Sequence, residues 1–319
     1  MNDFFSPLIE QKQAVEMLLQ SVEQNRVAPA YLFVGSEGIG RSLAASCFVE
    51  LLFDNSKKQD YTQLHHRIQQ RNHPDFLWVE PTYLHQGKLL IKAEAEAAGI
   101  KRKSPPQIRL DQIREISRFL SRPPLEAHQL VVVIEQAETM AEAAANGLLK
   151  TLEEPGNATI ILIAPSVDML LPTLISRCAK IPFYRLSQTA MQQVLQQQNY
   201  SEILANQEIL AMAQGSPGKA IYDWQQFQTI SSELLVKLKQ PPQTLQEALE
   251  WAKEINKTLD TEAQLWLIDY LQQCYWQQKY AGIQQRNILE QLEKTRQYLL
   301  NYAQPRLVWE STFLSLCPR

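Results

Sequence analysis

Residues 35–42, Gly-Ser-Glu-Gly-Ile-Gly-Arg-Ser, have the spacing of a phosphate-binding loop. In the pattern G-x-x-x-x-G-K-[ST], the glycines let backbone N–H groups point at the phosphates, the lysine meets the outer phosphates and the hydroxyl binds magnesium. The residues predicted to form this site are Gly35, Gly38, Gly40, Arg41 and Ser42. Arginine at the lysine position keeps the positive charge, but its forked guanidinium group is bulkier than the lysine ammonium group and does not simply replace it. The segment predicts a degenerate nucleotide site, at which ATP and magnesium could bind without hydrolysis.

A second chemical signal follows the apolar run 130–134. ATPases of this layout end such a strand with an aspartate that orients magnesium and a glutamate that activates water. This chain has Glu135 and Gln136 instead. Glu135 could still hold a metal through its longer arm, but Gln136 is uncharged and cannot accept the proton of an attacking water. Taken alone, residues 130–136 fit a buried strand followed by polar residues as well as they fit a nucleotide site. Only their combination with residues 35–42 favours the nucleotide site.

These residues need a scaffold of strands and helices to hold them. Residues 30–34 read as a buried strand directly before the loop, and a helical segment follows the loop to about residue 52. Further apolar runs, separated by helical or turn segments, lie at 76–79, 130–134, 159–163 and 180–183. Strands that alternate with helices indicate a parallel sheet of about five strands.

Beyond Pro182 the strand signals fade and helical spacing takes over. Short helices are expected over 187–198 and 206–213. From about Trp224 the chain is rich in glutamine and holds five of its six tryptophans, with apolar residues recurring at helical spacing. We therefore expect a small helical domain followed by a packed helical bundle.

Composition sets limits on function. The 319 residues suffice for two domains, with three possible, and the 45% hydrophobic residues and net charge of −3 are those of an ordinary globular protein. With 31 basic and 34 acidic residues, binding of DNA through the overall charge of the protein is excluded.

The sequence also bears on location and metal binding. Neither a signal peptide nor a membrane-spanning run is recognisable, so a cytoplasmic location is expected. The four cysteines lack metal-ligand spacing, and the histidines at 65, 66 and 73 lack co-ligands, so no zinc or other metal site is expected.

Three further stretches carry a family resemblance: His-Pro-Asp at 73–75, Asn-Gly-Leu-Leu-Lys-Thr-Leu-Glu-Glu-Pro at 146–155 and Leu-Pro-Thr-Leu-Ile-Ser-Arg-Cys at 171–178. Together they resemble the delta-prime family of bacterial DNA polymerase III clamp-loader subunits, over about residues 5–220. The resemblance implies an AAA+ P-loop module at 1–182, a small helical lid at 183–222 and an all-α collar at 223–319.

The same resemblance implies a set of partners. These would be ATPase subunits of the gamma/tau type and a delta-type subunit, joined in a five-subunit ring that loads the sliding clamp onto primer-template DNA, with no membrane contact. Polymerase chemistry would belong to the whole holoenzyme, because no pair of metal-binding carboxylates in a polymerase-like arrangement is recognisable here. Lys101-Arg102-Lys103 could touch DNA in such a ring, although an exposed basic loop is more often simply solvated.

In the family's Ser-Arg-Cys motif, the arginine reaches the γ-phosphate of ATP held by a neighbouring subunit, which assigns that role to Arg177. An arginine supplied in trans can raise phosphoryl-transfer rates by about 10³ to 10⁵. Taken alone, Arg177 would be a surface charge at a helix end. Its setting between Ser176 and Cys178, after Leu-Pro-Thr, favours the arginine finger.

Several positions depart from the pattern of ATP-hydrolysing relatives. Ala164 replaces a sensor threonine, and Gly218 stands at the position of a sensor arginine. The segment 54–72 lacks the four zinc-binding cysteines that many members carry. With Arg41 and Gln136 also off-pattern, the first hypothesis is a subunit that does not hydrolyse ATP but donates Arg177. The alternatives are an active P-loop ATPase with a non-standard loop, and a helical adaptor on a vestigial nucleotide fold.

Overall fold

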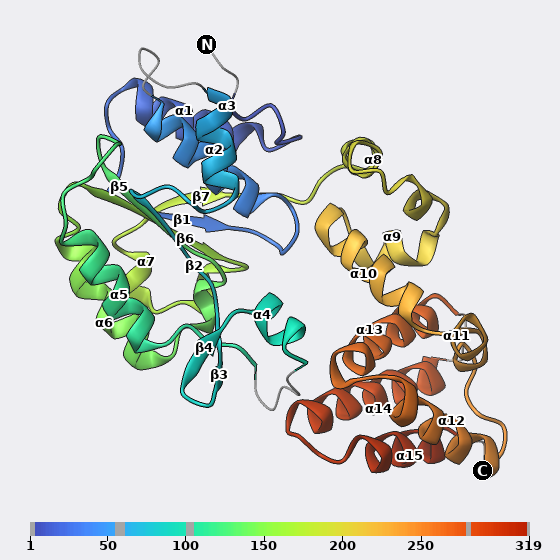
Figure 1. Ribbon diagram of the computed structural model, residues 1–319. Coiled ribbons are helices and arrows are strands. Elements are labelled where there is room, and N and C mark those ends of the chain that lie inside the picture. The colour runs from blue at the N-terminus through green and yellow to red at the C-terminus, as the bar shows by residue number, and fades with distance from the viewer. Residues whose placement is uncertain (1–3, 55–60, 100–104, 279–281, 318–319) are drawn as a thin grey trace. The chain divides into compact units, whose positions relative to one another are not determined.

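The computed structural model describes residues 4–54, 61–99, 105–278 and 282–317. The chain divides into two compact units, Met1–Ala190 and Met191–Arg319. Figure 1 shows strands with helices in the first unit and helices alone in the described part of the second.

The first unit is built on a five-stranded parallel sheet with the strand order β2-β5-β6-β1-β7. Its strands are β1 (Ala30–Val34), β2 (Phe76–Val79), β5 (Leu130–Ile134), β6 (Ala158–Ala164) and β7 (Ala179–Pro182). The central strands β5 and β6 are buried along their whole length, which explains why their sequences are unbroken apolar runs. The predicted parallel sheet of about five strands is confirmed.

Helices cover both faces of this sheet (Figure 1). On one face lie α1 (Lys12–Glu23), α2 (Arg41–Phe53) and α3 (Tyr61–Gln69), and on the other α5 (Leu110–Leu120), α6 (Glu142–Glu153) and α7 (Pro172–Ile175). Tyr31 of β1 meets Phe48 of α2 edge-to-face with ring centroids 5.2 Å apart. On the opposite face, Ile113 and Leu148 share a buried cluster with Val132 and Leu162. The sheet is thus the middle of three layers.

An excursion between β2 and α5 was not predicted as structured. It contains a hairpin of β3 (Tyr83–His85) and β4 (Lys88–Leu90), followed by α4 (Lys92–Ala97). Thr82 and Gln107 exchange backbone hydrogen bonds of 3.0 and 3.1 Å. The two ends of the excursion therefore lie side by side. The basic residues 101–103 lie outside the described residues.

The remaining elements of the first unit are short. They are the 3₁₀ turns η1 (Ala137–Thr139) and η2 (Val167–Met169). Helix α8 (Gln188–Gln197) begins at the end of this unit and continues into the second.

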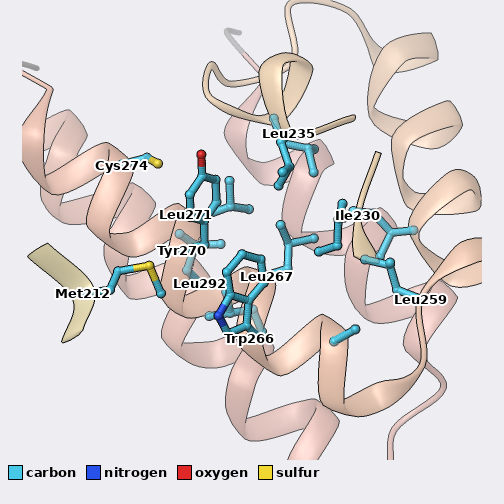
Figure 2. Close-up of a cluster of buried hydrophobic side chains, with 14 of the residues drawn as sticks. Met212, Ile230, Leu235, Leu259, Trp266, Leu267, Tyr270, Leu271, Cys274 and Leu292 are labelled. Atoms are coloured by element: carbon cyan, nitrogen blue, oxygen red, sulfur yellow. The ribbon is translucent and has the colours of Figure 1, made fainter. Parts of the chain in front are cut away.

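The second unit is helical throughout its described residues. Its elements are η3 (Ser201–Ala205), α9 (Gln207–Ala213), α10 (Pro217–Thr229), α11 (Ser232–Leu238), α12 (Leu245–Thr258), α13 (Thr261–Gln277), α14 (Gly282–Leu300) and α15 (Pro305–Leu316). One buried cluster extends from Met191 to Phe313, and Figure 2 shows Met212 of α9 beside Trp266 and Tyr270 of α13. The helical C-terminal region is confirmed, while its division into a lid at 183–222 and a collar at 223–319 stays a prediction.

Hydrogen bonds inside this core satisfy its largest polar side chains. Trp266 donates from Nε1 to Asp223 Oδ1 at 3.0 Å, and Trp309 donates to Gln264 Oε1 at 2.9 Å. In contrast, Trp276 is 67% exposed.

Among the helices of the described residues, none combines the length and the apolar character that a membrane span requires.

Candidate functional site

The predicted phosphate loop joins the end of β1 to the start of α2. Its conformation depends on glycine at three positions. A Cβ on Gly35 would lie 2.5 Å from the backbone oxygen of Phe183, and Gly40 has φ +102°. Gly38 also has a positive φ, of +74°. The three glycines therefore serve the backbone path that the sequence predicted, a tight turn leading into a helix N-terminus.

Gln11, which sequence reasoning missed, ties this loop to the rest of the sheet. Its side chain is almost fully buried and donates to the carbonyl oxygens of Ile39 (3.3 Å) and Tyr184 (2.6 Å), while its Oε1 accepts from the N–H of Tyr184 (3.1 Å). The contact joins residues 173 positions apart in the chain. No local pattern marks such a residue, since it lies outside the loop motif.

Three of the predicted site residues come together behind the loop. Ser42 donates from Oγ to Glu135 Oε1 at 2.7 Å, and the Arg41 side chain lies close enough to Glu135 for their charges to interact. The two groups that would share a magnesium ion are thus hydrogen-bonded to each other. Arg41 is only 6% exposed, and its Nη1 has no hydrogen-bond partner within the described chain.

Burial governs the electrostatics of this group. It lowers the pKa of the Arg41 guanidinium, an effect that Glu135, Glu138 and Glu37 oppose by their negative charge. Burial also raises the pKa of Glu135 and of Glu138 above the usual value for glutamate. Several carboxylates therefore face one cation before any ligand arrives, and this arrangement disfavours a polyphosphate that comes without a divalent ion.

Glu138 is a second member of the pocket that sequence reasoning missed. It lies in η1 directly after β5, three residues beyond Glu135, and its Oε2 is buried with no hydrogen-bond partner within the described ranges. Gln136 has φ +49°, and its carbonyl oxygen accepts from Thr139 Oγ1 at 2.8 Å. Its amide side chain offers no general base.

Arg177 lies on the surface of the first unit, after α7. Its Nη2 donates to Glu153 Oε1 at 2.6 Å, and its Nη1 donates to the carbonyl oxygen of Thr173 at 2.9 Å and, more weakly, to Ser176 Oγ at 3.5 Å. The side chain is 35% exposed. All these partners belong to α6, α7 or the turn after it, so the structure does not bring Arg177 into the group of Arg41, Ser42 and Glu135.

Comparison with known proteins identifies the family. A sequence model described as "DNA polymerase III, delta subunit" matches residues 10–187, and one described as "Cyanobacterial DNA polymerase III delta prime, C-terminal domain" matches residues 189–316. The chain belongs to the DNA polymerase III delta-prime family. The first model alone covers more than half of the sequence, and the two together cover nearly all of it.

Individual relatives agree with this assignment. The DNA polymerase III subunit delta-prime of Bacillus subtilis is 31% identical over 199 residues, which are 61% of this chain and 54% of that protein. The Pseudomonas aeruginosa delta-prime subunit is also 31% identical over 199 residues, covering 60% of this chain and 54% of the relative. The matched region thus spans just over half the length of these relatives.

A solved structure supports the fold. A gamma-subunit-related protein of DNA polymerase III from Thermotoga maritima superposes with a TM-score of 0.52 at 16% identity, over 95% of this chain and 98% of that one. At this identity the likeness concerns architecture. The chain has an α/β module with a five-stranded parallel sheet followed by a helical region, as the sequence predicted.

Two positions that depart from the pattern of ATP-hydrolysing relatives lie at the end of β6 and at the start of α10. Ala164 ends β6, is fully buried, and its carbonyl oxygen accepts a long hydrogen bond from the N–H of Gly35 at 3.4 Å. A methyl group there offers no hydroxyl to a phosphate.

In the second unit, Gly218 lies in the first turn of α10. The neighbouring Lys219 forms an ion pair with the buried Asp223, with 3.0 Å between Nζ and Oδ1.

Two histidines that the sequence considered for metal binding have structural partners. His65 Nδ1 lies 2.9 Å from the buried carboxylate of Glu50, and the ring of His73 packs on Phe53 with a centroid distance of 4.7 Å. Across the described ranges, no group of three His, Cys, Asp or Glu side chains is arranged to hold a metal ion.

Proposed function

We propose that this chain is a clamp-loader subunit of the DNA polymerase III holoenzyme that does not split ATP itself, braces the ring, and donates Arg177 to the ATP site of a neighbouring subunit. The observation that carries this proposal is a contrast between two arginines. Arg41 is buried among carboxylates of its own chain, whereas Arg177 is partly exposed, with N–H groups available to an outside phosphate.

The chemistry of the pocket supports the absence of hydrolysis. Hydrolysis is helped by a general base that accepts the proton of the attacking water, and residue 136 is a glutamine, whose uncharged amide cannot do so. Ser42 and Glu135 would have to exchange their mutual hydrogen bond for magnesium ligation. Burial also raises the pKa of Glu135 above the usual value for glutamate, because desolvation disfavours the charged form.

The geometry of Arg177 supports a role in trans. A guanidinium has five N–H groups, and three of them are engaged by Glu153, Thr173 and Ser176. The Nε–H and one hydrogen on Nη2 have no partner among the residues that the structure describes. Two N–H groups in one plane suit bidentate contact with phosphate oxygens, and such contacts stabilise the charge of the transferred phosphoryl group.

The partners follow from the family. Relatives of this chain include the tau subunit of Bacillus subtilis, which is 26% identical over 188 residues, 59% of this chain and 30% of that protein. We propose that gamma/tau-type ATPase subunits and a delta-type subunit join this chain in a five-subunit ring, and that the sliding clamp and primer-template DNA are reached through that complex. Any DNA-directed DNA polymerase activity then belongs to the holoenzyme.

The test is the ATP turnover of the complex reconstituted from the same organism's subunits. Arg177→Ala should leave assembly intact and depress turnover, and Arg177→Lys should restore it poorly because an ammonium lacks the planar fork. Arg114→Ala is the matched control, since Arg114 is also an exposed arginine paired with a carboxylate, that of Asp111. Unchanged turnover in Arg177→Ala would remove the proposed role.

One alternative keeps a specific observation in its favour. Ser42 and Glu135 lie side by side next to the glycine loop, and Arg41 Nη1 is a buried donor with no partner in the described residues. An active P-loop ATPase with a non-standard loop would show steady hydrolysis by the purified chain, lost on Ser42→Ala. A helical adaptor without a replication role would instead fail to co-purify with the other subunits.

A further inference from the structure

We propose that Glu153 is a positioning residue that presets the Arg177 guanidinium for a neighbour's phosphate, an inference that rests on the proposed function. Its carboxylate Oε1 lies 2.6 Å from Arg177 Nη2, and the carbonyl oxygen of Thr173 lies 2.9 Å from Nη1. Each terminal nitrogen of the fork is therefore anchored to a different part of the same chain.

Two hydrogen bonds to different nitrogens fix the plane of the Arg177 guanidinium, whereas a single bond would leave it free to rotate. Arginine has a long side chain whose rotamer freedom must be lost before it can grip a phosphate. The contacts from Glu153 and Thr173 remove part of that freedom in the free subunit, and the Nε–H remains outside the contacts. Groups that are ordered before the reaction contribute more to catalysis than groups that must be ordered during it.

The anchors belong to elements that are rigidly packed. Glu153 is the last residue of α6, and α6 packs directly against α7, in which Thr173 lies. Leu152, next to Glu153, and Leu174, next to Thr173, are both buried in the same hydrophobic cluster. The backbone positions of Glu153 and Thr173 are therefore held by the same hydrophobic cluster, as a device that orients a side chain requires.

Stability does not explain a glutamate at this position. The C-terminus of a helix carries a partial negative charge and favours lysine or arginine, yet α6 ends in Glu153 followed by Glu154. The ion pair that Glu153 gains in return is solvent-exposed, with side chains 53% and 35% accessible, and such pairs stabilise a fold little. Residues that break a local rule without a structural gain are often explained by function.

The experiment measures kcat and KM for ATP in the reconstituted complex carrying Glu153→Ala or Glu153→Gln. Glu153→Ala should lower the kcat of the site that Arg177 serves by about fivefold, the upper value for an exposed ion pair, with KM for ATP unchanged. Glu153→Gln should recover part of that loss, because an amide oxygen still accepts a hydrogen bond from Nη2. Glu154→Ala, which removes the adjacent carboxylate, is the matched control and should change neither constant.

A double variant separates positioning from a merely structural effect. In the Arg177→Ala background, adding Glu153→Ala should cause no further loss, because the group that Glu153 orients is gone. A further loss in that background, an equal loss in Glu154→Ala, or faster turnover in Glu153→Ala would overturn the inference. If Arg177→Ala itself leaves turnover unchanged, the proposed function fails instead, so the two failures are distinguishable.

Discussion

Asp75, in the His-Pro-Asp motif, offers the sharpest test of how this structure is held together. The side chain is fully buried, and its carboxylate accepts three backbone N–H groups at 2.7 Å each, from Leu125 to Oδ1 and from Glu126 and Ala127 to Oδ2. We predict that Asp75→Asn loosens the loop that contains residues 125–127. An amide can accept at one of the two positions only, so at least one of these N–H groups loses its partner.

The size of the effect follows from these contacts. Hydrogen bonds to a charged acceptor are worth about 1.5–3 kcal/mol each, more than those to a neutral one, and the substitution removes at least one and weakens the others. A total of about 2–4 kcal/mol is expected, which corresponds to an increase of about 30-fold or more in local opening.

Amide hydrogen exchange of the peptide that contains residues 125–127 measures this directly. Asp111→Asn is the control, because the same substitution is made at an aspartate that is 73% exposed. Unchanged exchange at 125–127 in Asp75→Asn would refute the reasoning, as would an equal increase in Asp111→Asn.

The same carboxylate implies a dependence on pH. Burial alone would raise the pKa of Asp75, but the three backbone N–H groups outweigh that effect and hold its pKa below the usual value. Because the folded-state pKa is the lower one, the stabilisation is complete above the unfolded pKa and is lost as pH falls through the folded pKa. Protection of residues 125–127 should therefore decline in acid in the natural chain.

Three further predictions concern the pocket. Gly35→Ala should lower the free energy of unfolding by about 1–3 kcal/mol in urea denaturation, because its Cβ would lie 2.5 Å from a backbone oxygen. Gly156→Ala should cost less, because its Cβ meets no described atom within 4 Å and only the strain of its φ of +66° remains. Ser42→Ala should cost about 1–3 kcal/mol because it leaves the Glu135 carboxylate unpaired, whereas Ser46→Ala, which removes only a bond to its own helix, should be milder. The purified chain should release no phosphate from ATP with magnesium, and steady release would contradict the proposed function.

Much of the scaffold could be predicted because its signals are local. A parallel strand buried on both faces is a continuous apolar run, and residues 76–79 and 130–134 were delimited as the structure has them. The excursion over 83–107 was missed for the opposite reason. Its strands have three residues each, too few to show a period, and its closure between Thr82 and Gln107 is a contact across 25 positions. Gln86 and Gly87 both have a positive φ in the hairpin turn, and of this the sequence showed only the glycine.

The candidate site divides in the same way. The loop residues and Glu135 were predicted because each follows a strand within a known spacing. Gln11 could not be found, since nothing in its surroundings indicates that it reaches Ile39 and Tyr184. Likewise, the sequence placed Arg177 in a motif but gave no sign that Glu153, in a different motif, would hold it.

The central claim is tested most directly by steady-state ATP turnover of the reconstituted complex with Arg177→Ala in place of the natural chain. The rate at the adjoining ATP site should fall by about 10³-fold or more, so total turnover should fall by at least that site's share while the subunits still co-elute. Full turnover by an intact complex that lacks the Arg177 guanidinium would contradict the account.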